Sequence, residues 1–177
     1  FRDKYSFITY ILLVVLIIKV SGDSAYNKVI PNKRVNDVTQ INPIQVGKEL
    51  QPLTIEEIVE AVKSTEGPIS IGGGRFSMGG QIGYENSLHI DMRKFNKVLH
   101  LDTITKQVTV QSGIVWRDLQ KVIDPHHLSI KIMQTYANFT VGGSVSVNCH
   151  GRYIGHGPIA SSVMEIKIIT ASGEIVT

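Results

Sequence analysis

The stretch that decides how this chain folds is GGGRFSMGG, residues 72–80. Glycine supplies most of its positions, and Arg75 is its single charged residue. An apolar run, residues 68–71, comes directly before it and has the character of a short buried strand. Glycine removes side chains and widens the allowed backbone conformations, so such a loop either makes a tight turn or lets backbone N–H groups converge on an anion. Both readings stay open at this point.

A pyrophosphate is the anion that the residue types in this loop would suit. Gly72, Gly73 and Gly74 would offer backbone N–H groups, Arg75 a positive charge and Ser77 a hydroxyl. The loop is not a Walker A sequence, because no Gly-Lys-Ser/Thr follows it. The Rossmann fingerprint is also poorly met, because serine stands where the third glycine should be.

Composition describes a globular protein of 177 residues, with 42% hydrophobic and 19% charged residues. The net charge is +3 and the basic residues are scattered, so we expect no nucleic-acid partner. Cys149 is the single cysteine, which excludes an intramolecular disulfide and a cysteine-rich metal site. We expect it to be a packed thiol. His126 and His127 lack further ligands at fitting spacing, so we expect them at the surface without a metal.

The N-terminal part differs from the rest. Residues 7–18, FITYILLVVLII, are almost wholly apolar, with Arg2 and Lys4 before them and small polar residues after them. As a helix they would span about 18 Å, short of the roughly 30 Å hydrocarbon core. Residues 1–25 therefore read as a signal peptide, with a membrane anchor through residues 7–18 or a buried strand as alternatives. We expect an exported or membrane-attached protein.

The remaining pattern predicts an α+β fold. Residues 26–41 read as an extended lead-in, and Thr54 with Glu57 forms a capping box before a helix over 55–64. A second helix is predicted over 114–123, with Trp116 in the core. Neighbouring strands joined by tight turns are predicted over 87–92, 97–101 and 107–111, each alternating inward and outward, and a hairpin over 163–177.

A second glycine-bearing segment is TVGGSVSVNCHGR, residues 140–152. Gly142 and Gly143 allow close backbone approach, and small residues follow. As a helix it would pack tightly against a flat ligand and turn its N-terminal amides toward an anion. As a strand it would be a glycine-interrupted part of the core. The sequence alone does not separate these two readings.

The two segments, in this order, resemble the FAD-binding domain of the vanillyl-alcohol oxidase/p-cresol methylhydroxylase (PCMH-type) family, especially its aldonolactone and alditol oxidase branch. The resemblance covers residues 42–177 and includes matching stretches at 42–43, 53–58, 72–80, 89–92, 110–113, 140–143, 148–151, 157–158 and 169–174. It implies two small α+β subdomains with FAD laid across them, in a domain truncated at its C-terminus.

The resemblance also implies which residues hold FAD. The pyrophosphate would rest on residues 72–78, the segment 135–146 would approach the ribityl chain and ring, and residues 148–151 would brace that segment. The implied cofactor-binding residues are Gly72, Gly73, Gly74, Arg75, Phe76, Ser77, Met78, Thr135, Thr140, Gly142, Gly143, Ser146, Asn148, His150 and Gly151. Many members attach FAD to a histidine in the first loop. Neither Arg75 nor Phe76 can form that bond, so we expect non-covalent FAD.

The activity implied is oxidation of an alcohol, sugar alcohol or aldonolactone by hydride transfer to flavin N5, with oxygen or another electron acceptor. The catalytic base is expected beyond residue 177, so no catalytic residue is assigned and the fragment alone should be inactive. Two alternatives stay open. One is a flavoprotein like UDP-N-acetylenolpyruvoylglucosamine reductase, and the other is an exported binding module without flavin chemistry.

Overall fold

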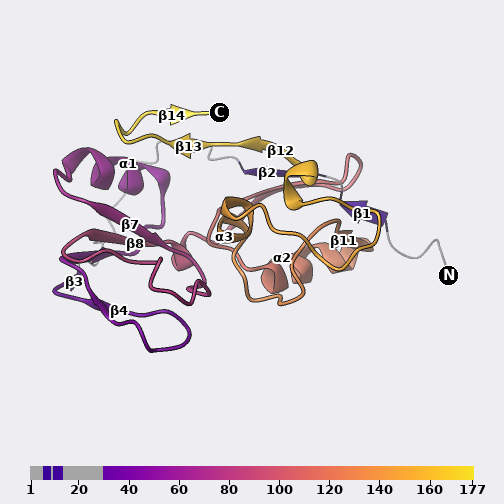
Figure 1. Cartoon of the computed structure of the whole chain (residues 1–177). Helices are drawn as coiled ribbons and strands as arrows, with labels where there is room; N and C mark the ends of the chain where they lie inside the picture. The colour runs from indigo at the N-terminus through magenta and orange to yellow at the C-terminus, as the bar shows by residue number, and fades with distance from the viewer. Residues whose placement is uncertain (1–5, 9, 14–29) are drawn as a thin grey trace. The chain divides into compact units, whose positions relative to one another are not determined.

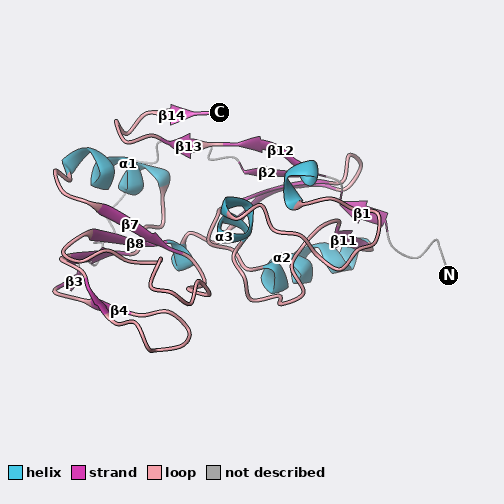
Figure 2. Ribbon diagram, viewed as in Figure 1, coloured by secondary structure: helices cyan, strands magenta, loops and turns pink. Residues whose placement is uncertain are grey.

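The computed structural model describes residues 6–8, 10–13 and 30–177. These residues divide into two compact units. Of the described residues, unit 1 contains 6–8, 10–13, 96–167 and 177, and unit 2 contains 30–95 and 168–176. Each unit combines helices with strands, which confirms the predicted α+β class (Figure 1, Figure 2).

Unit 2 is built on a four-stranded sheet in the order β3-β6-β8-β7. The first pair is antiparallel and the two others are parallel. Helix α1 connects β6 to β7, while β8 enters the sheet between these two strands (Figure 1). The elements are β3 (Ile30–Pro31), β6 (Lys48–Leu50), α1 (Ile55–Ser64), β7 (Ile69–Gly72) and β8 (Leu88–Asp91).

The start of α1 confirms the predicted helix and its cap. Thr54 Oγ1 accepts a hydrogen bond from the backbone N–H of Glu57 at 3.3 Å. The Glu57 carboxylate reaches back to the N–H of Leu53 at 2.7 Å, so it accepts from the residue before the cap. Ile55 and Ile58 are the buried residues of this helix.

Two hairpins complete unit 2. Strands β4 (Arg34–Val35) and β5 (Ile44–Gln45) pair antiparallel, and Val35 lies in a small buried cluster with Val46 and Ile82. This cluster fixes the hairpin to the chain that follows the glycine-rich loop. At the other end of the sequence, β13 (Ile168–Ile169) and β14 (Ile175–Val176) form the second hairpin.

Unit 1 contains a four-stranded sheet in the order β12-β2-β10-β9. Strands β12, β2 and β10 run parallel, and β9 is antiparallel to β10. A parallel pair, β1 with β11, lies in the same unit. The elements are β1 (Ser6–Ile8), β2 (Tyr10–Leu13), β9 (Val98–Asp102), β10 (Gln107–Val110), α2 (Trp116–Ile123), β11 (Leu128–Ile130), α3 (Val141–Ser146) and β12 (Val163–Ile166).

The core of unit 1 forms around α2. Trp116, Leu119 and Ile123 are fully buried, which confirms the expectation for Trp116. The indole Nε1–H donates to Ser144 Oγ at 2.9 Å, so this large side chain keeps its polar atom satisfied. Cys149 lies in the same core cluster, and its burial raises the pKa of the thiol. The packed-thiol expectation is therefore confirmed.

Three expectations about strands are wrong. β8 and β9 are not neighbours, because the short 3₁₀ helix η1 (Met92–Lys94) separates them and they pair in different sheets. Both β8 and β10 bury consecutive side chains, so the inward-outward alternation fails. A parallel interior strand is covered on both faces and loses that alternation. The stretch 163–170 is also two strands, of which only β13 forms the hairpin.

Part of the apolar N-terminal run is described. Within residues 7–18, the structure places strand residues at 7–8 and 10–13, and the others lie outside the described residues. Among the described residues, no helix is both long and apolar enough to cross a membrane.

Candidate functional site

The glycine-rich loop leaves the sheet at the end of β7. The residue with a left-handed backbone is Arg75, with φ of 62°, and Gly80 follows with φ of 77°. Gly72, Gly73 and Gly74 do not use positive φ. The loop therefore does not use the left-handed freedom that these three glycines allow.

Gly72 is instead required by a close approach. A Cβ atom added there would lie 2.8 Å from Nε2 of His89 on the neighbouring strand. Real Cβ contacts are never that short, so a side chain would force the buried imidazole to move. Close packing against His89 therefore requires glycine at position 72.

The loop presents backbone donors. Among the described residues, no hydrogen-bond acceptor is found for the N–H groups of Gly73, Gly74, Arg75, Ser77 and Met78. The loop closes behind them, where the N–H of Gly79 donates to Gln81 Oε1 at 2.7 Å. Successive open N–H groups on a short loop are the groups that bind phosphate oxygens.

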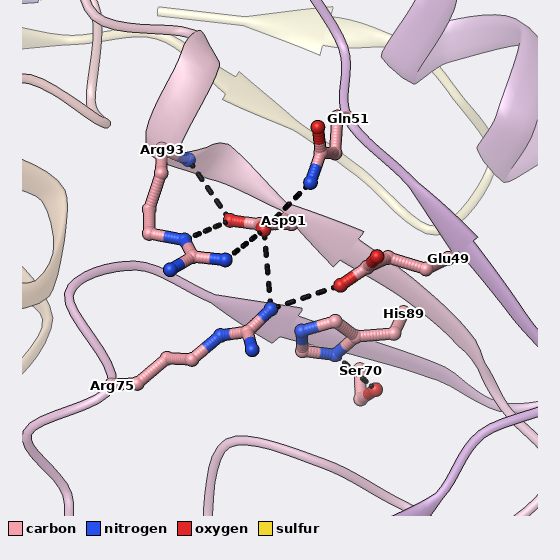
Figure 3. A network of polar contacts seen from close by, with 7 residues as sticks. All are labelled: Glu49, Gln51, Ser70, Arg75, His89, Asp91 and Arg93. Atoms are coloured by element: carbon pink, nitrogen blue, oxygen red, sulfur yellow. Dashed lines mark hydrogen bonds and ion pairs between the residues drawn. The ribbon is translucent and has the colours of Figure 1, made fainter. Parts of the chain in front are cut away.

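The side chain of Arg75 is paired within the protein and does not add to these donors for a phosphate. Its Nη2 donates to Glu49 Oε1 at 3.0 Å and to Asp91 Oδ2 at 3.1 Å, and the side chain is only 13% exposed (Figure 3). Two buried carboxylates thus balance the charge of the guanidinium. The expectation that Arg75 adds a free positive charge for a phosphate is wrong, whereas its backbone N–H is one of the open donors.

Asp91 is the centre of this network. Arg93 binds it with two nitrogen atoms, Nε at 2.8 Å and Nη2 at 2.6 Å, and Gln51 Nε2 donates to it at 3.2 Å (Figure 3). Burial alone would raise the pKa of this carboxyl. The hydrogen bonds and charge of Arg93, with the charge of Arg75, outweigh burial and hold the pKa below its ordinary value. Asp91 is therefore ionised at neutral pH, between two arginines.

His89 is fully buried beside Arg75, and its hydrogen bonds fix its tautomer. Ser87 Oγ donates to the carbonyl oxygen of Tyr84 at 2.7 Å, so Ser70 Oγ, 2.8 Å away, must donate to Ser87. Ser70 Oγ then accepts from His89 Nδ1 at 3.0 Å. Burial, followed by the charge of Arg75, lowers the pKa of His89 to about 4. The ring is neutral, with its proton on Nδ1.

Two buried atoms of this network have no hydrogen-bond partner in the described part of the chain: Nε of Arg75 and Nε2 of His89. The first is a donor and the second, by the tautomer above, is an acceptor. Both lie near Gly72, at 3.7 Å and 2.8 Å from the position that a Cβ atom would take there. A polar network is therefore incomplete directly under the start of the loop.

The second segment forms helix α3, so the helical reading is confirmed. Its first amides, however, are used within the protein. Val141 donates to the Ile114 carbonyl and Gly142 to the Ser112 carbonyl, both at 2.8 Å, while Gly143 donates to Thr140 Oγ1 at 3.3 Å. The expectation that these amides face an anion is wrong, because they dock the helix onto the neighbouring loop.

The other predicted residues of unit 1 lie around this helix. Gly142 packs on Ser112, whose Cβ would be 2.7 Å from an added Cβ atom. Thr135, Ser146, Asn148 and His150 are exposed. Asn148 Oδ1 accepts from the N–H of Ala160 at 3.3 Å, and the N–H of Cys149 donates to the Ser144 carbonyl at 3.0 Å. Asn148 and Cys149 thus hold the end of α3, whereas a bracing role of His150 and Gly151 stays a prediction.

No metal site accompanies these residues. In the ranges that the structure describes, no group of three or more His, Cys, Asp or Glu side chains is placed to hold a metal ion. His126 and His127 are exposed, which confirms their expected place at the surface.

Sequence reasoning overlooked the residues under the loop. Glu49 is 2% exposed and Ser70 is also buried, yet neither belongs to a recognisable motif. His89 and Asp91 lie in an HID stretch that matches the family and that the sequence predicts to be a strand, without a polar role for either side chain. An acid and a histidine that interrupt an apolar strand were the available signal of a buried polar network.

Comparison with known proteins identifies the family. The FAD binding domain family matches residues 50–177. Bovine L-gulonolactone oxidase is 33% identical over 128 residues, which cover 71% of this chain and 29% of that enzyme. Streptomyces alditol oxidase is 33% identical over 73 residues, 41% of this chain and 18% of that enzyme. D-arabinono-1,4-lactone oxidase of Candida glabrata is 23% identical over 133 residues, 71% of this chain and 25% of that enzyme.

The chain therefore belongs to the FAD binding domain family, which confirms the resemblance and the cofactor class drawn from the sequence. The chain spans less than a third of the length of these relatives. Its residues fit a dinucleotide at one place in unit 2, where the loop after β7 carries open N–H donors and no exposed carboxylate.

Proposed function

We propose that this chain is the FAD-binding part of an oxidoreductase that oxidises the CH–OH group of an alcohol, sugar alcohol or aldonolactone. The observation that carries the proposal is the set of open backbone N–H groups on Gly73, Gly74, Arg75, Ser77 and Met78, in a chain of the FAD binding domain family. The names of the relatives, L-gulonolactone oxidase and alditol oxidase, support this substrate class.

In this proposal, the pyrophosphate is held by backbone N–H groups of the loop and not by a cationic side chain. The loop keeps its shape because Gly72 packs on His89 and because Arg75 is tied to Glu49 and Asp91. When bound, the flavin supplies the acceptor for a hydride and passes the electrons on to oxygen or another acceptor. We assign no catalytic base among the residues that the structure describes.

The segment of unit 1 is proposed to hold the flavin end of the cofactor through its exposed groups. These are Thr135, Ser146, Asn148 and His150, with Thr140, Gly142, Gly143 and Gly151 supporting them. In the same proposal, the FAD-binding domain extends over residues 42–177 and consists of two subdomains that share the cofactor.

The FAD is proposed to be non-covalent. Arg75 and Phe76 provide no atom to which FAD could be bonded. In the described part of unit 2 the histidine is His89, and its side chain is fully buried. Acid precipitation of the flavin-loaded protein tests this directly. We expect all yellow colour in the supernatant, and colour that stays with the precipitated protein would overturn the assignment.

The proposed function is tested by titrating the purified chain with FAD and following flavin absorbance and fluorescence. We expect a saturable change in the flavin band, competed by ADP, because ADP presents the same pyrophosphate to the loop. A folded chain that leaves the flavin spectrum unchanged would contradict the proposal. Restoring the remaining sequence of the protein and adding an aldonolactone or an alditol, with peroxide as readout, then tests the substrate class and the use of oxygen.

Residues 7–18 are proposed to direct export or membrane attachment. Their apolar character and the basic residues before them support this. Fractionation of cells that express the natural protein, with and without residues 1–25, tests it. Identical distribution of both forms in the soluble interior would refute the proposal.

A further inference from the structure

Asp37 is a buried carboxylate outside the region that the family match covers. It is 1% exposed and lies in the loop between β4 and β5, whereas the match begins at residue 50. Thr39 donates to it twice, from its backbone N–H at 2.9 Å and from its hydroxyl. Asn42 Nδ2 donates to its other oxygen at 3.2 Å, and the backbone of Gly80 also bonds to it.

These bonds keep Asp37 charged. The hydroxyl of Thr39 contributes most, ahead of the opposing effect of burial, and together with Asn42 and Gly80 it holds the pKa below its ordinary value. A buried carboxylate with this set of donors is ionised at neutral pH.

The loop between β4 and β5 contacts the backbone of the glycine-rich loop at three points. The N–H of Val38 donates to the carbonyl of Arg75 at 2.9 Å. Asn42 Nδ2 donates to the carbonyl of Met78 at 3.4 Å. The carboxylate of Asp37 holds the backbone of Gly80, where the loop turns with positive φ.

These contacts occupy carbonyl oxygens of the glycine-rich loop that would otherwise oppose anion binding. The hairpin binds two carbonyl oxygens of the glycine-rich loop, those of Arg75 and Met78. A carbonyl oxygen is the negative end of the peptide dipole, so a free one beside a phosphate would repel it. The hairpin therefore engages the carbonyls of Arg75 and Met78, two residues whose own N–H groups stay open.

We propose that Asp37 is a positioning residue for FAD: through Asn42 and Gly80 it clamps the glycine-rich loop in the conformation that presents its N–H groups to the pyrophosphate. The inference rests on the proposed function and extends the site to residues 36–42. It assigns these residues to the cofactor site through their contacts with the glycine-rich loop.

The test compares two variants that each remove part of the Asp37 cluster. Asp37→Asn keeps the shape and an oxygen for Thr39, but it turns an amide donor toward the donor of Asn42 and removes the charge to which Gly80 also bonds. Thr39→Val removes the hydroxyl bond within the hairpin and leaves the arm that reaches the glycine-rich loop. FAD dissociation constants, urea unfolding and hydrogen exchange of the amides of residues 73–80 are measured for both and for the wild type.

We expect Asp37→Asn to weaken FAD about tenfold and to speed amide exchange in residues 73–80, because hydrogen bonds to a charged acceptor are lost. Thr39→Val should leave FAD affinity within about twofold of the wild type, even if its urea unfolding midpoint falls as far as that of Asp37→Asn. Equal FAD affinity in the wild type and Asp37→Asn overturns the clamp, as does an equal loss in both variants. A wild-type chain that does not bind FAD instead refutes the proposed function.

Discussion

The buried imidazole under the loop should make the stability of unit 2 depend on pH. Replacing His89 by Asn keeps a side-chain N–H for Ser70 and removes the titrating nitrogen. In the folded protein the pKa of His89 is lowered to about 4, by burial first and then by the charge of Arg75. In the unfolded chain the same group has its ordinary value, 6.5. Protons therefore bind the unfolded state preferentially between these two values.

The sign and size follow from proton linkage. Because the unfolded state binds more protons, stability rises with pH through the window from about 4 to 6.5, and the contribution of His89 is fully present only above it. The two pKa values give a loss of about 2 kcal/mol between pH 7 and pH 5. The variant His89→Asn lacks this loss, although it is less stable overall because the ring leaves a cavity.

The assay is urea unfolding of the chain without FAD at pH 7 and pH 5. Carboxylates contribute to both proteins alike, so the quantity of interest is the difference between their pH dependences. We expect the wild type to lose about 2 kcal/mol more than His89→Asn on going to pH 5. His100→Asn, at an exposed position of β9, is the matched control and should behave like the wild type. Identical pH dependence of the wild type and His89→Asn would refute a neutral buried His89.

Three further outcomes test the network and the core. Gly72→Ala should cost about 1–3 kcal/mol in urea unfolding, because its Cβ meets His89 at 2.8 Å; an unchanged midpoint would contradict this close packing. Glu49→Gln should cost about 3 kcal/mol, since it leaves Arg75 buried with one carboxylate fewer, and a more stable variant would show that the ion pair is not needed. The thiol of Cys149, with its pKa raised by burial, should react with a disulfide reagent at pH 8 roughly tenfold more slowly in the folded chain than in urea. Equal rates in both states would place the thiol at the surface.

The elements that could be predicted are those that carry local signals. Helix α1 was found from a cap at Thr54 and an apolar face, and the hairpin of β13 and β14 from its turn residues. The glycine clusters singled out loop 72–80 and the segment 140–152, although the sequence left open whether the second segment is a helix or a strand. The family itself followed from the order of these short stretches.

The remaining features depend on contacts between residues far apart in the sequence. Glu49, Arg75 and Asp91 meet because β6 and β8 are parallel neighbours and the loop after β7 returns to them. No local pattern encodes such a meeting. The use of the first amides of α3 was missed for the same reason, since their acceptors at residues 112 and 114 come from another segment.

The error about Arg75 is the most instructive one for the cofactor site. A cation in a glycine-rich loop suggests a phosphate ligand, yet a guanidinium in this place would also repel a protonated imidazole beside it. In the structure, Glu49 and Asp91 pair with the charge of Arg75, and His89 stays neutral, so that the guanidinium does not repel it. What remains for the anion is the backbone, whose N–H groups carry partial charges fixed in position. Recognition through a rigid backbone needs a rigid support, and the network on one side and the β4–β5 hairpin on the other supply it.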